Sequence, residues 1–132
     1  MNKVRGYIFS RPFMGERVPQ HVQNLVIRDY CEKNNLQYLL SKTEYAMPDC
    51  HLILKQIIEE LPELFGIIVY SLFQLPENTN LRKAIYQKVI EDKKNIYFAV
   101  EGIKANNILD FEQVETLWDI RQTLPQCINI LV

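Results

Sequence analysis

Short apolar runs with β-strand character alternate with amphipathic helical stretches along the whole chain, and this alternation constrains the fold more than any other feature. Strands are predicted at residues 4–10, 36–40, 65–70 and 96–100. The third run, FGIIVY, is almost entirely apolar, as expected for a central parallel strand covered on both faces. The alternation predicts an α/β fold with a small, doubly wound, mainly parallel sheet of roughly four to five strands and helices on both faces.

Helices are predicted where apolar residues recur at helical spacing. They are expected from Pro19 to residues 34–35, over residues 54–61, over residues 81–92 and around residues 111–118. Pro19 suits a first helical turn because the N–H that proline lacks would have no intrahelical partner there. The apolar tail, residues 127–132, is predicted to pair as a strand at a sheet edge. Since no repeat or linker interrupts the pattern, residues 1–132 are predicted to form a single domain.

The composition is that of a globular protein without a strong charge bias. Of 132 residues, 48% are hydrophobic and 23% are charged, and the formal net charge is −1. Proteins that act mainly on nucleic acid are usually basic, so this charge argues against such a partner. Three cysteines without a CxxC pair are expected to be reduced thiols. With neither a signal peptide nor a membrane-spanning run, the sequence predicts a cytoplasmic protein that has no membrane partner.

Polar residues gather in the segments that follow the predicted strands. Because ligands of open parallel sheets bind beyond the carboxyl ends of the strands, these segments are expected to meet at one rim. They comprise residues 10–23, 43–47, 71–77 and 101–102. The candidate ligand-binding residues among them are Arg11, Glu16, Arg17, Gln20, Gln23, Tyr45, Ser71, Gln74 and Glu101.

Two arginines bracket the segment that leads into the first helix. Together with the helix N-terminus, Arg11 and Arg17 would suit a phosphate or carboxylate, although Glu16 and Arg17 could equally be solvated or paired with neighbours. Gln20 and Gln23 lie on one side of that helix and could read the hydroxyls of a sugar, or they could simply face water. The segment lacks the glycines of a phosphate-cradling loop, and the sequence identifies no cofactor.

Three residues of the rim are candidates for proton transfer or nucleophilic chemistry: Ser10, His21 and Glu44. Ser10 lacks a GxSxG elbow, and a histidine at a helix start is often an exposed polar residue. Glu44 and Glu101 could form a carboxylate pair, but no metal-binding spacing accompanies them, so no metal is predicted. These residues do not define a reaction.

Five segments distributed over nearly the whole chain are specific enough to compare with known families: GYIFSRPFMGERVPQHVQN, TEYAM, GIIVYSLFQLPEN, FAVEG and TLPQC. In this order they resemble small proteins of sporadically distributed bacterial carbohydrate-biosynthesis clusters. Membership would imply a role in making or decorating surface polysaccharide, with a sugar or nucleotide-sugar as ligand. The resemblance implies no particular reaction.

A second pattern comprises Tyr7 near a serine, Gln20 and Gln23 at the start of the first helix, Tyr30 late in it, residues 72–75 after a central strand and residues 101–103 after the next strand. In this order, about the first hundred residues resemble the catalytic domain of resolvase/invertase-type serine recombinases, which implies a resolvase-like, mainly parallel α/β fold. The family pattern Y-x-R-x-S begins at Tyr7, but Phe9 and Arg11 occupy the arginine and serine positions, and Ser10 is one position early. The family's D-R-L-x-R stretch appears as residues 73–77, FQLPE. Since the acid and both arginines are absent there, and phosphoryl transfer depends on such charges, recombinase activity is not expected.

The sequence is compatible with three functions. The first is an enzyme of surface-carbohydrate or nucleotide-sugar metabolism with its site at the rim, and the second is a non-catalytic partner subunit of a neighbouring pathway enzyme. The third is a degenerate, nucleic-acid-binding relative of the recombinases. Residues 81–92 or the last helix could also provide a homodimer face, because two-fold dimers are the commonest oligomers.

Overall fold

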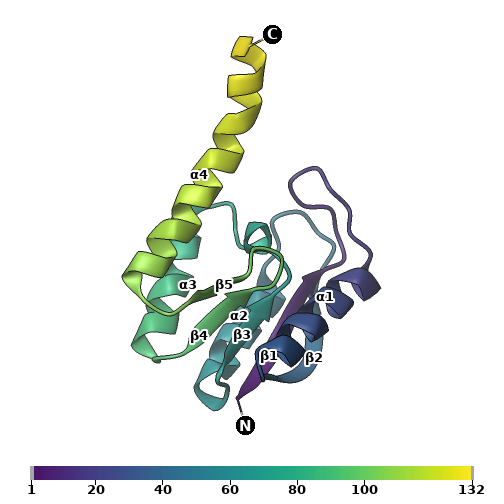
Figure 1. Cartoon of the computed structure of the whole chain (residues 1–132), viewed down its shortest axis with the longest axis vertical. Helices are drawn as coiled ribbons and strands as arrows, with labels where there is room; N and C mark the ends of the chain where they lie inside the picture. The colour runs from purple at the N-terminus through teal and green to yellow at the C-terminus, as the bar shows by residue number, and fades with distance from the viewer. Residues whose placement is uncertain (1, 132) are drawn as a thin grey trace.

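The sheet has five strands in the order β2-β1-β3-β4-β5. The computed structural model describes the backbone of residues 2–131 and side chains through residue 123 (Figure 1). The strands are β1 (Lys3–Phe9), β2 (Gln37–Glu44), β3 (Gly66–Val69), β4 (Asn95–Phe98) and β5 (Ile103–Ala105). Pairing is parallel throughout β2-β1-β3-β4, whereas β5 runs antiparallel to β4. The predicted α/β fold with a mainly parallel sheet is confirmed.

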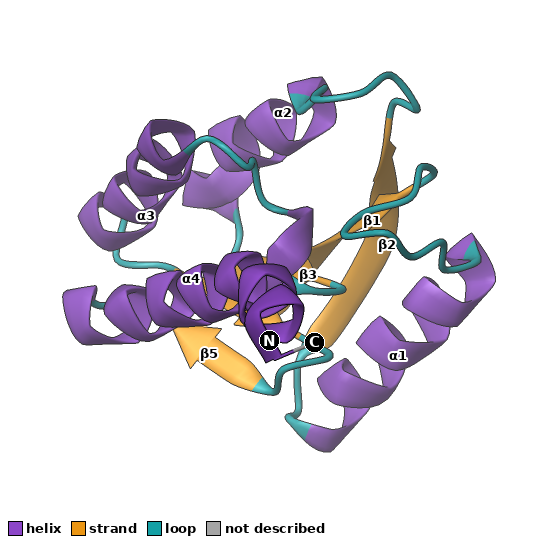
Figure 2. Cartoon of the chain, turned by 90° about the horizontal axis from the view of Figure 1, so that it is seen from above, coloured by secondary structure: helices purple, strands orange, loops and turns teal. Residues whose placement is uncertain are grey.

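Helices cover both faces of the sheet, as predicted, but unevenly (Figure 2). The helices are α1 (Gln20–Lys33), α2 (Leu52–Glu60), α3 (Thr79–Glu91) and α4 (Ile108–Leu131), with short 3₁₀ turns η1 (Leu61–Glu63) and η2 (Leu72–Gln74). Alternate residues of β3 serve the two faces: Ile67 and Val69 pack with α2, α3 and α4, and Ile68 packs with α1. No helix in the described part of the chain is both long enough and apolar enough to cross a membrane.

The second strand is longer than the sequence predicts, because it continues from residue 40 through Glu44. Its C-terminal part is polar (SKTE) because β2 is an edge strand, paired with β1 alone. The register with β1 shifts between Arg5 and Tyr7. At the shift, the Ser41 side chain occupies the space that a Cβ on Gly6 would need. The sequence predicts Glu44 in the segment after the second strand. In the structure, Glu44 is the last residue of β2.

The prediction of an edge strand in residues 127–132 is wrong for the residues that the structure describes. Helix α4 continues to Leu131, and the edge beside β4 is taken by β5, which the sequence analysis did not identify. An apolar run of this length does not distinguish strand from helix by its periodicity. β5 forms because the chain turns back after β4 at Gly102, which has a φ of +67° and donates its backbone N–H to the Phe98 carbonyl at 2.9 Å.

Helix α4 is joined to α3 by an ion pair between a buried arginine and a half-buried glutamate, next to an aromatic ring. Arg82 of α3 is 2% exposed and donates to both oxygens of Glu115, from Nε at 2.8 Å and from Nη2 at 2.9 Å. Its guanidinium also lies 4.3 Å from the ring centroid of Trp118. The Tyr86 hydroxyl donates to Glu115 at 2.6 Å. These contacts fix the first half of α4 on the sheet, while its C-terminal half extends away from the rest of the chain (Figure 1).

Candidate functional site

The strand order reverses between β1 and β3. Strand β2 lies next to β1 on one side, whereas β3, followed by β4, lies on the other side. Ligands of open α/β sheets bind outside the carboxyl ends of the strands at such a reversal. A pocket of about 260 Å³ lies there, which we call the rim pocket. It is lined by Phe9, Arg11, Pro12, Phe13, Met14, Ala46, Pro48, Asp49, His51, Phe73, Leu75 and Glu77.

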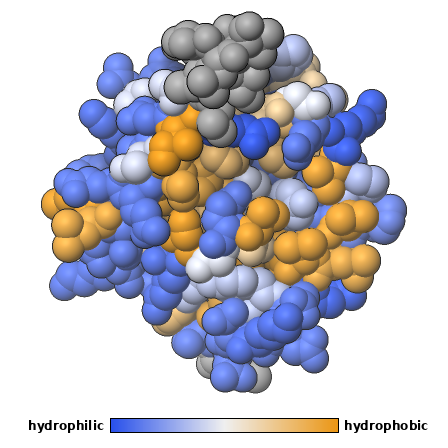
Figure 3. All heavy atoms as spheres, turned by 45° about the horizontal axis from the view of Figure 1, so that its top comes forward, coloured by the Kyte–Doolittle hydropathy of each residue, from blue (hydrophilic) through white to orange (hydrophobic). Residues whose placement is uncertain are grey.

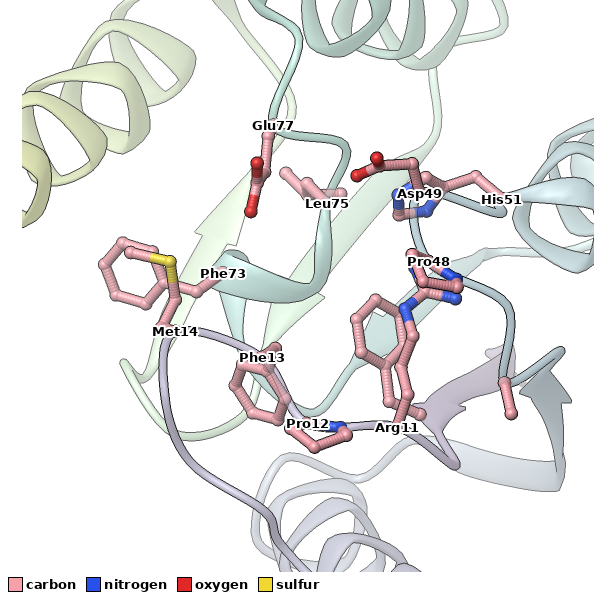
Figure 4. A pocket seen from close by; sticks show the side chains of 12 residues that line it. Arg11, Pro12, Phe13, Met14, Pro48, Asp49, His51, Phe73, Leu75 and Glu77 are labelled. Carbon is pink, nitrogen blue, oxygen red and sulfur yellow. The ribbon is translucent and has the colours of Figure 1, made fainter.

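Three segments far apart in the sequence form the walls of the rim pocket (Figure 4). Arg11, Pro12 and Phe13 lie along one side, and Leu75 and Glu77, which follow β3, lie opposite. Residues 46–51, between β2 and α2, close the pocket between them. The segments that follow β1 and β3 therefore share one cavity, as the sequence analysis predicted. On this side of the molecule, exposed apolar side chains are interspersed with polar ones (Figure 3).

Arg11 is the one arginine among the residues that line this pocket, and its position is fixed by two contacts. Its Nη1 donates to the Tyr45 backbone carbonyl at 2.8 Å, and its guanidinium carbon lies 4.2 Å from the centroid of the Phe9 ring. Phe9 in turn meets Phe13 edge to face, with the ring centroids 5.7 Å apart. The remaining N–H groups of the guanidinium are available to a ligand that carries an anionic group.

Hydrogen-bonding contacts connect the buried Glu44 at the end of β2, through Tyr7, to His51 at the rim pocket. The buried hydroxyl of Tyr7 lies 2.9 Å from Oε1 of Glu44 and 3.3 Å from Nδ1 of His51. His51 lines the rim pocket and ends the segment that enters α2. A neutral imidazole in this position can accept a proton from a ligand, so His51 is the acid–base candidate that this geometry favours.

Glu44 is 1% exposed and serves as a cap for α2, supplied from a neighbouring strand. Its carboxylate accepts backbone N–H groups of Ile53 and Leu54, each at 3.2 Å, in the first turn of the helix. Burial acts to raise the pKa of Glu44, but the N–H groups of Ile53, Tyr45 and Leu54 and the Tyr7 hydroxyl outweigh it and hold that pKa below its ordinary value. Glu44 is therefore a buried carboxylate anion at a positive helix end.

The surroundings of His51 favour its neutral form. Burial lowers the pKa of the imidazole, the positive charge of Arg11 lowers it further, and the carboxylates of Glu44 and Asp49 oppose both effects only in part. His51 is thus predominantly uncharged near neutral pH, whereas Arg11 beside it is always charged.

Two of the predicted site residues form a buried bridge instead of lining the pocket. Gln23 accepts the Phe9 N–H at 3.0 Å and donates to the Phe9 and Val18 carbonyls, each at 2.9 Å. Gln74 donates to Oε1 of Gln23 at 2.8 Å. Both side chains are fully buried, so they hold the ends of β1 and β3 together behind the rim pocket.

The other predicted residues fall into three groups. Ser10 and Tyr45 act near the pocket: the Ser10 hydroxyl donates to the Glu44 carbonyl at 2.9 Å, and the Tyr45 carbonyl holds Arg11. Ser71 and Glu101 bond to each other at 2.8 Å and, with Glu16, line a smaller hollow of about 140 Å³. The third group is exposed and lines neither the rim pocket nor the smaller hollow: Arg17, Gln20 and His21.

Of the three candidates for proton transfer or nucleophilic chemistry, the structure brings Ser10 to the backbone of Glu44, and His21 forms no side-chain hydrogen bond with either among the described residues. The predicted carboxylate pair of Glu44 and Glu101 is not formed, because β1 and β3 separate the ends of β2 and β4. Within the described residues, no cluster of three or more potential ligands could hold a metal ion. Sequence reasoning missed His51, because a histidine just before α2 carries no local signal of its distance to Tyr7.

The fold of this chain resembles that of resolvase-type catalytic domains. A resolvase family site-specific recombinase from Streptococcus pneumoniae is similar over 97% of this chain and 98% of that one, with a TM-score of 0.63 and 13% identity. The N-terminal catalytic domain of TP901-1 integrase matches over 96% and 98%, with a TM-score of 0.55 and 15% identity. No known family model matches the sequence, and no curated protein does. At these identities the likeness concerns the fold.

The chemistry of the rim pocket departs from the recombinase pattern stated above. Phe73 and Glu77 line the pocket at the positions where that pattern has an acid and an arginine. Gln74, at the position of the other arginine, is buried in the bridge to Gln23. The wall of the pocket formed after β3 is therefore aromatic and acidic, and it lacks the cations that would stabilise a phosphodiester in transfer.

Proposed function

We propose that the rim pocket binds a small ligand that combines an anionic group with sugar hydroxyls, and that the chain serves bacterial surface-carbohydrate biosynthesis in this way. A sugar phosphate or a nucleotide-sugar has the required chemistry. The observation that carries the proposal is the position of Arg11, anchored on Phe9 and Tyr45 with the rest of its guanidinium at the pocket. The carbohydrate role itself rests on the sequence resemblance.

The residues that line the pocket can each contact a chemical group that a sugar phosphate carries. The guanidinium of Arg11 suits a phosphate or carboxylate, which it can bind through two N–H groups. The rings of Phe13 and Phe73 offer apolar faces to the C–H side of a sugar ring. Asp49 and Glu77 can accept hydrogen bonds from hydroxyls. A volume of about 260 Å³ suits one sugar unit rather than an oligosaccharide.

The same charges argue against nucleic acid as the ligand. Binding to a phosphate backbone requires several cations along one surface. Here one arginine faces two carboxylates, Asp49 and Glu77, across the pocket. A single terminal phosphate could contact Arg11 alone. A continuous nucleic-acid backbone would also bring its phosphates close to the carboxylates of Asp49 and Glu77, which repel them.

Calorimetry and thermal shift with glucose 1-phosphate, UDP-glucose, inorganic phosphate and glucose test this proposal. The native protein should bind at least one of the two phosphorylated sugars more tightly than phosphate or glucose alone. Arg11→Ala should weaken that binding by about tenfold or more, because a charged, bidentate contact is lost. Arg17→Ala is the matched control, since Arg17 is exposed and lies outside the pocket. Equal responses from both variants would contradict the assignment.

A second candidate function, that of a non-catalytic partner subunit, is favoured by helix α4. Ile108, Leu109 and Ile120 of this helix are 66%, 76% and 50% exposed, and α4 extends beyond the sheet (Figure 1). Co-purification from the native host tests it: the chain should leave with a pathway enzyme, and Leu109→Asp should release that enzyme. Glu112→Lys, at another exposed position of α4, is the control. A chain that purifies alone would contradict this function.

A further inference from the structure

We propose that His51 is the proton acceptor of the rim pocket, and that Tyr7 and Glu44 hold it in the tautomer whose proton is on Nδ1, with Nε2 free for a ligand hydroxyl or water. This inference rests on the proposed function of the pocket as a ligand site. Its three groups come from β1, the end of β2 and the residue before α2, and the distances of 2.9 and 3.3 Å connect them.

The tautomer follows from the number of protons available. Tyr7 has a single hydroxyl proton, and its two neighbours are the Glu44 carboxylate and the His51 Nδ1. A carboxylate anion is a stronger acceptor than a neutral imidazole nitrogen, so the proton points to Glu44. The oxygen of Tyr7 then presents a lone pair to Nδ1. The contact at 3.3 Å is attractive only if Nδ1 carries a hydrogen.

The reverse arrangement would require a protonated Glu44. The carboxylate already accepts backbone N–H groups from Tyr45, Ile53 and Leu54, and those donors favour the anion. A protonated Glu44 would give up much of this stabilisation at the N-terminus of α2. The Tyr7 hydroxyl itself stays protonated, because burial and the neighbouring Glu44 charge raise its pKa.

The other ring nitrogen of His51 is directed away from this buried pair. Among the described residues, no protein atom forms a hydrogen bond with Nε2. A buried nitrogen without a partner would be unsatisfied, and Nε2 is not one of the buried, unsatisfied polar atoms, so solvent can reach it. The His51 ring lies at the pocket wall next to Asp49, and Arg11 lines the same pocket (Figure 4). A ligand anchored by Arg11 would therefore meet an unprotonated nitrogen.

The step that this arrangement permits is a proton transfer. The proton leaves a ligand hydroxyl or a water molecule, whose oxygen keeps the electron pair, and it arrives on Nε2. The resulting imidazolium is stabilised through Nδ1–H by Tyr7, which is itself bonded to the Glu44 carboxylate. This is the logic by which a buried carboxylate orients a histidine base, here with a tyrosine hydroxyl between them. His51 touches the ligand, whereas Tyr7 and Glu44 position it.

Several charged groups would influence the titration of His51. They are Arg11 after β1, Glu44 at the end of β2, Asp49 in the preceding segment, Glu77 across the rim pocket, and Lys55 of α2, which shares an adjoining groove with His51. The anion of a bound ligand would neutralise Arg11 and so favour the imidazolium form. Binding and proton acceptance are therefore expected to reinforce each other.

Nitrogen-15 NMR of the histidine rings tests the tautomer without any ligand. Comparison with His51→Asn assigns the His51 signals, and His21 provides a second ring in the same spectrum. The native protein should show a protonated Nδ1 and an unprotonated Nε2 for His51 near neutral pH. Tyr7→Phe should shift the ring toward the Nε2–H tautomer while leaving the His21 signals unchanged. An Nε2–H tautomer in the native protein would overturn the proposal.

Tyr7 is buried, so a second measurement guards against a variant that fails to fold. The native protein alone is titrated with glucose 1-phosphate and then with UDP-glucose, and the Nε2 resonance of His51 is followed. A shift of Nε2 that saturates with binding supports its contact with the ligand. Binding that leaves Nε2 unmoved would overturn the role of His51 and leave the pocket assignment intact. If neither compound binds, the pocket assignment fails, and the tautomer is still decided by the ligand-free spectrum.

Discussion

The side-chain amide of Gln74 donates to Oε1 of Gln23 at 2.8 Å, across 51 residues of sequence and inside the protein. Gln23 also pairs with both backbone groups of Phe9. One amide of α1 thus fixes the end of β1 and the turn after β3, the two strands between which the sheet order reverses. Phe9, whose backbone this bridge holds, lines the rim pocket.

Removal of the bridge should destabilise the protein. Gln23→Leu leaves the Phe9 N–H and carbonyl and the Val18 carbonyl without their side-chain partner in a buried place. We expect a loss of about 2–4 kcal/mol in the free energy of unfolding, measured by urea denaturation. Gln20→Leu, at an exposed position of the same helix, should change it by less than about 0.5 kcal/mol. A fully stable Gln23→Leu protein would show that the bridge is dispensable.

The ion pair between α3 and α4 gives the second prediction. Glu115→Ala leaves Arg82, which is 2% exposed, without the carboxylate that accepts two of its N–H groups. An uncompensated buried charge should cost about 3–5 kcal/mol of unfolding free energy. Glu112→Ala, an exposed position of α4, is the control in the same denaturation series. Similar small losses in both variants would mean that the Pro76 and Glu77 carbonyls, to which Arg82 also donates, suffice to stabilise its charge.

Acid should remove the stabilisation that Glu44 provides. The pKa of Glu44 in the folded protein lies below its ordinary value of 4.5, so the unfolded chain binds more protons in acid than the folded one. This contribution is fully present above about pH 4.5 and is lost as the pH falls through the lowered, folded-state pKa.

Glu44→Gln should therefore be less stable than the native protein at pH 7 and show a weaker loss of stability in acid. Urea midpoints measured from pH 7 down to pH 3 check both expectations. A Glu44→Gln protein with the same pH dependence as the native one would show that other carboxyls dominate the acid transition.

The fourth prediction separates structural from ligand-binding roles at Glu101. Its carboxylate accepts the Ser71 hydroxyl at 2.8 Å and the Leu72 N–H at 2.9 Å, which holds the turn after β3. Glu101→Gln keeps the shape but leaves a single acceptor oxygen for these two donors, so we expect a loss of about 1–3 kcal/mol in unfolding free energy. Affinity for glucose 1-phosphate should change much less than in Arg11→Ala, as calorimetry can measure. A larger loss of affinity than of stability would place Glu101 at the ligand.

The sequence predicted the parts of the fold that depend on local pattern. The apolar run before Ser71 became the fully buried β3, and the helical stripes became α1 to α4. It missed β5, because three residues, one exposed and one half-buried, carry too little periodicity to register. It also extended the sheet into the C-terminal tail, where the backbone is helical to Leu131.

The site was predicted in location but only in part in composition. Arg11 follows a strand directly, so its arrival at the rim could be foreseen. Glu44 was foreseen as a reactive carboxylate, and the structure shows it capping α2 behind the pocket. Gln23 and Gln74 were both predicted to bind a ligand at the rim, with a water-facing alternative for Gln23. Nothing local in the sequence reveals that they meet each other in the interior.

What the sequence by itself determined is the succession of strands and helices and the edge of the sheet at which polar segments gather, because both follow from hydrophobic periodicity and chain direction. Tertiary structure alone decided which side chains face the pocket, since that depends on crossovers that bring residues 7, 44 and 51 within hydrogen-bonding distance. Proton positions on Tyr7 and His51 are set by those contacts, and no sequence spacing encodes them.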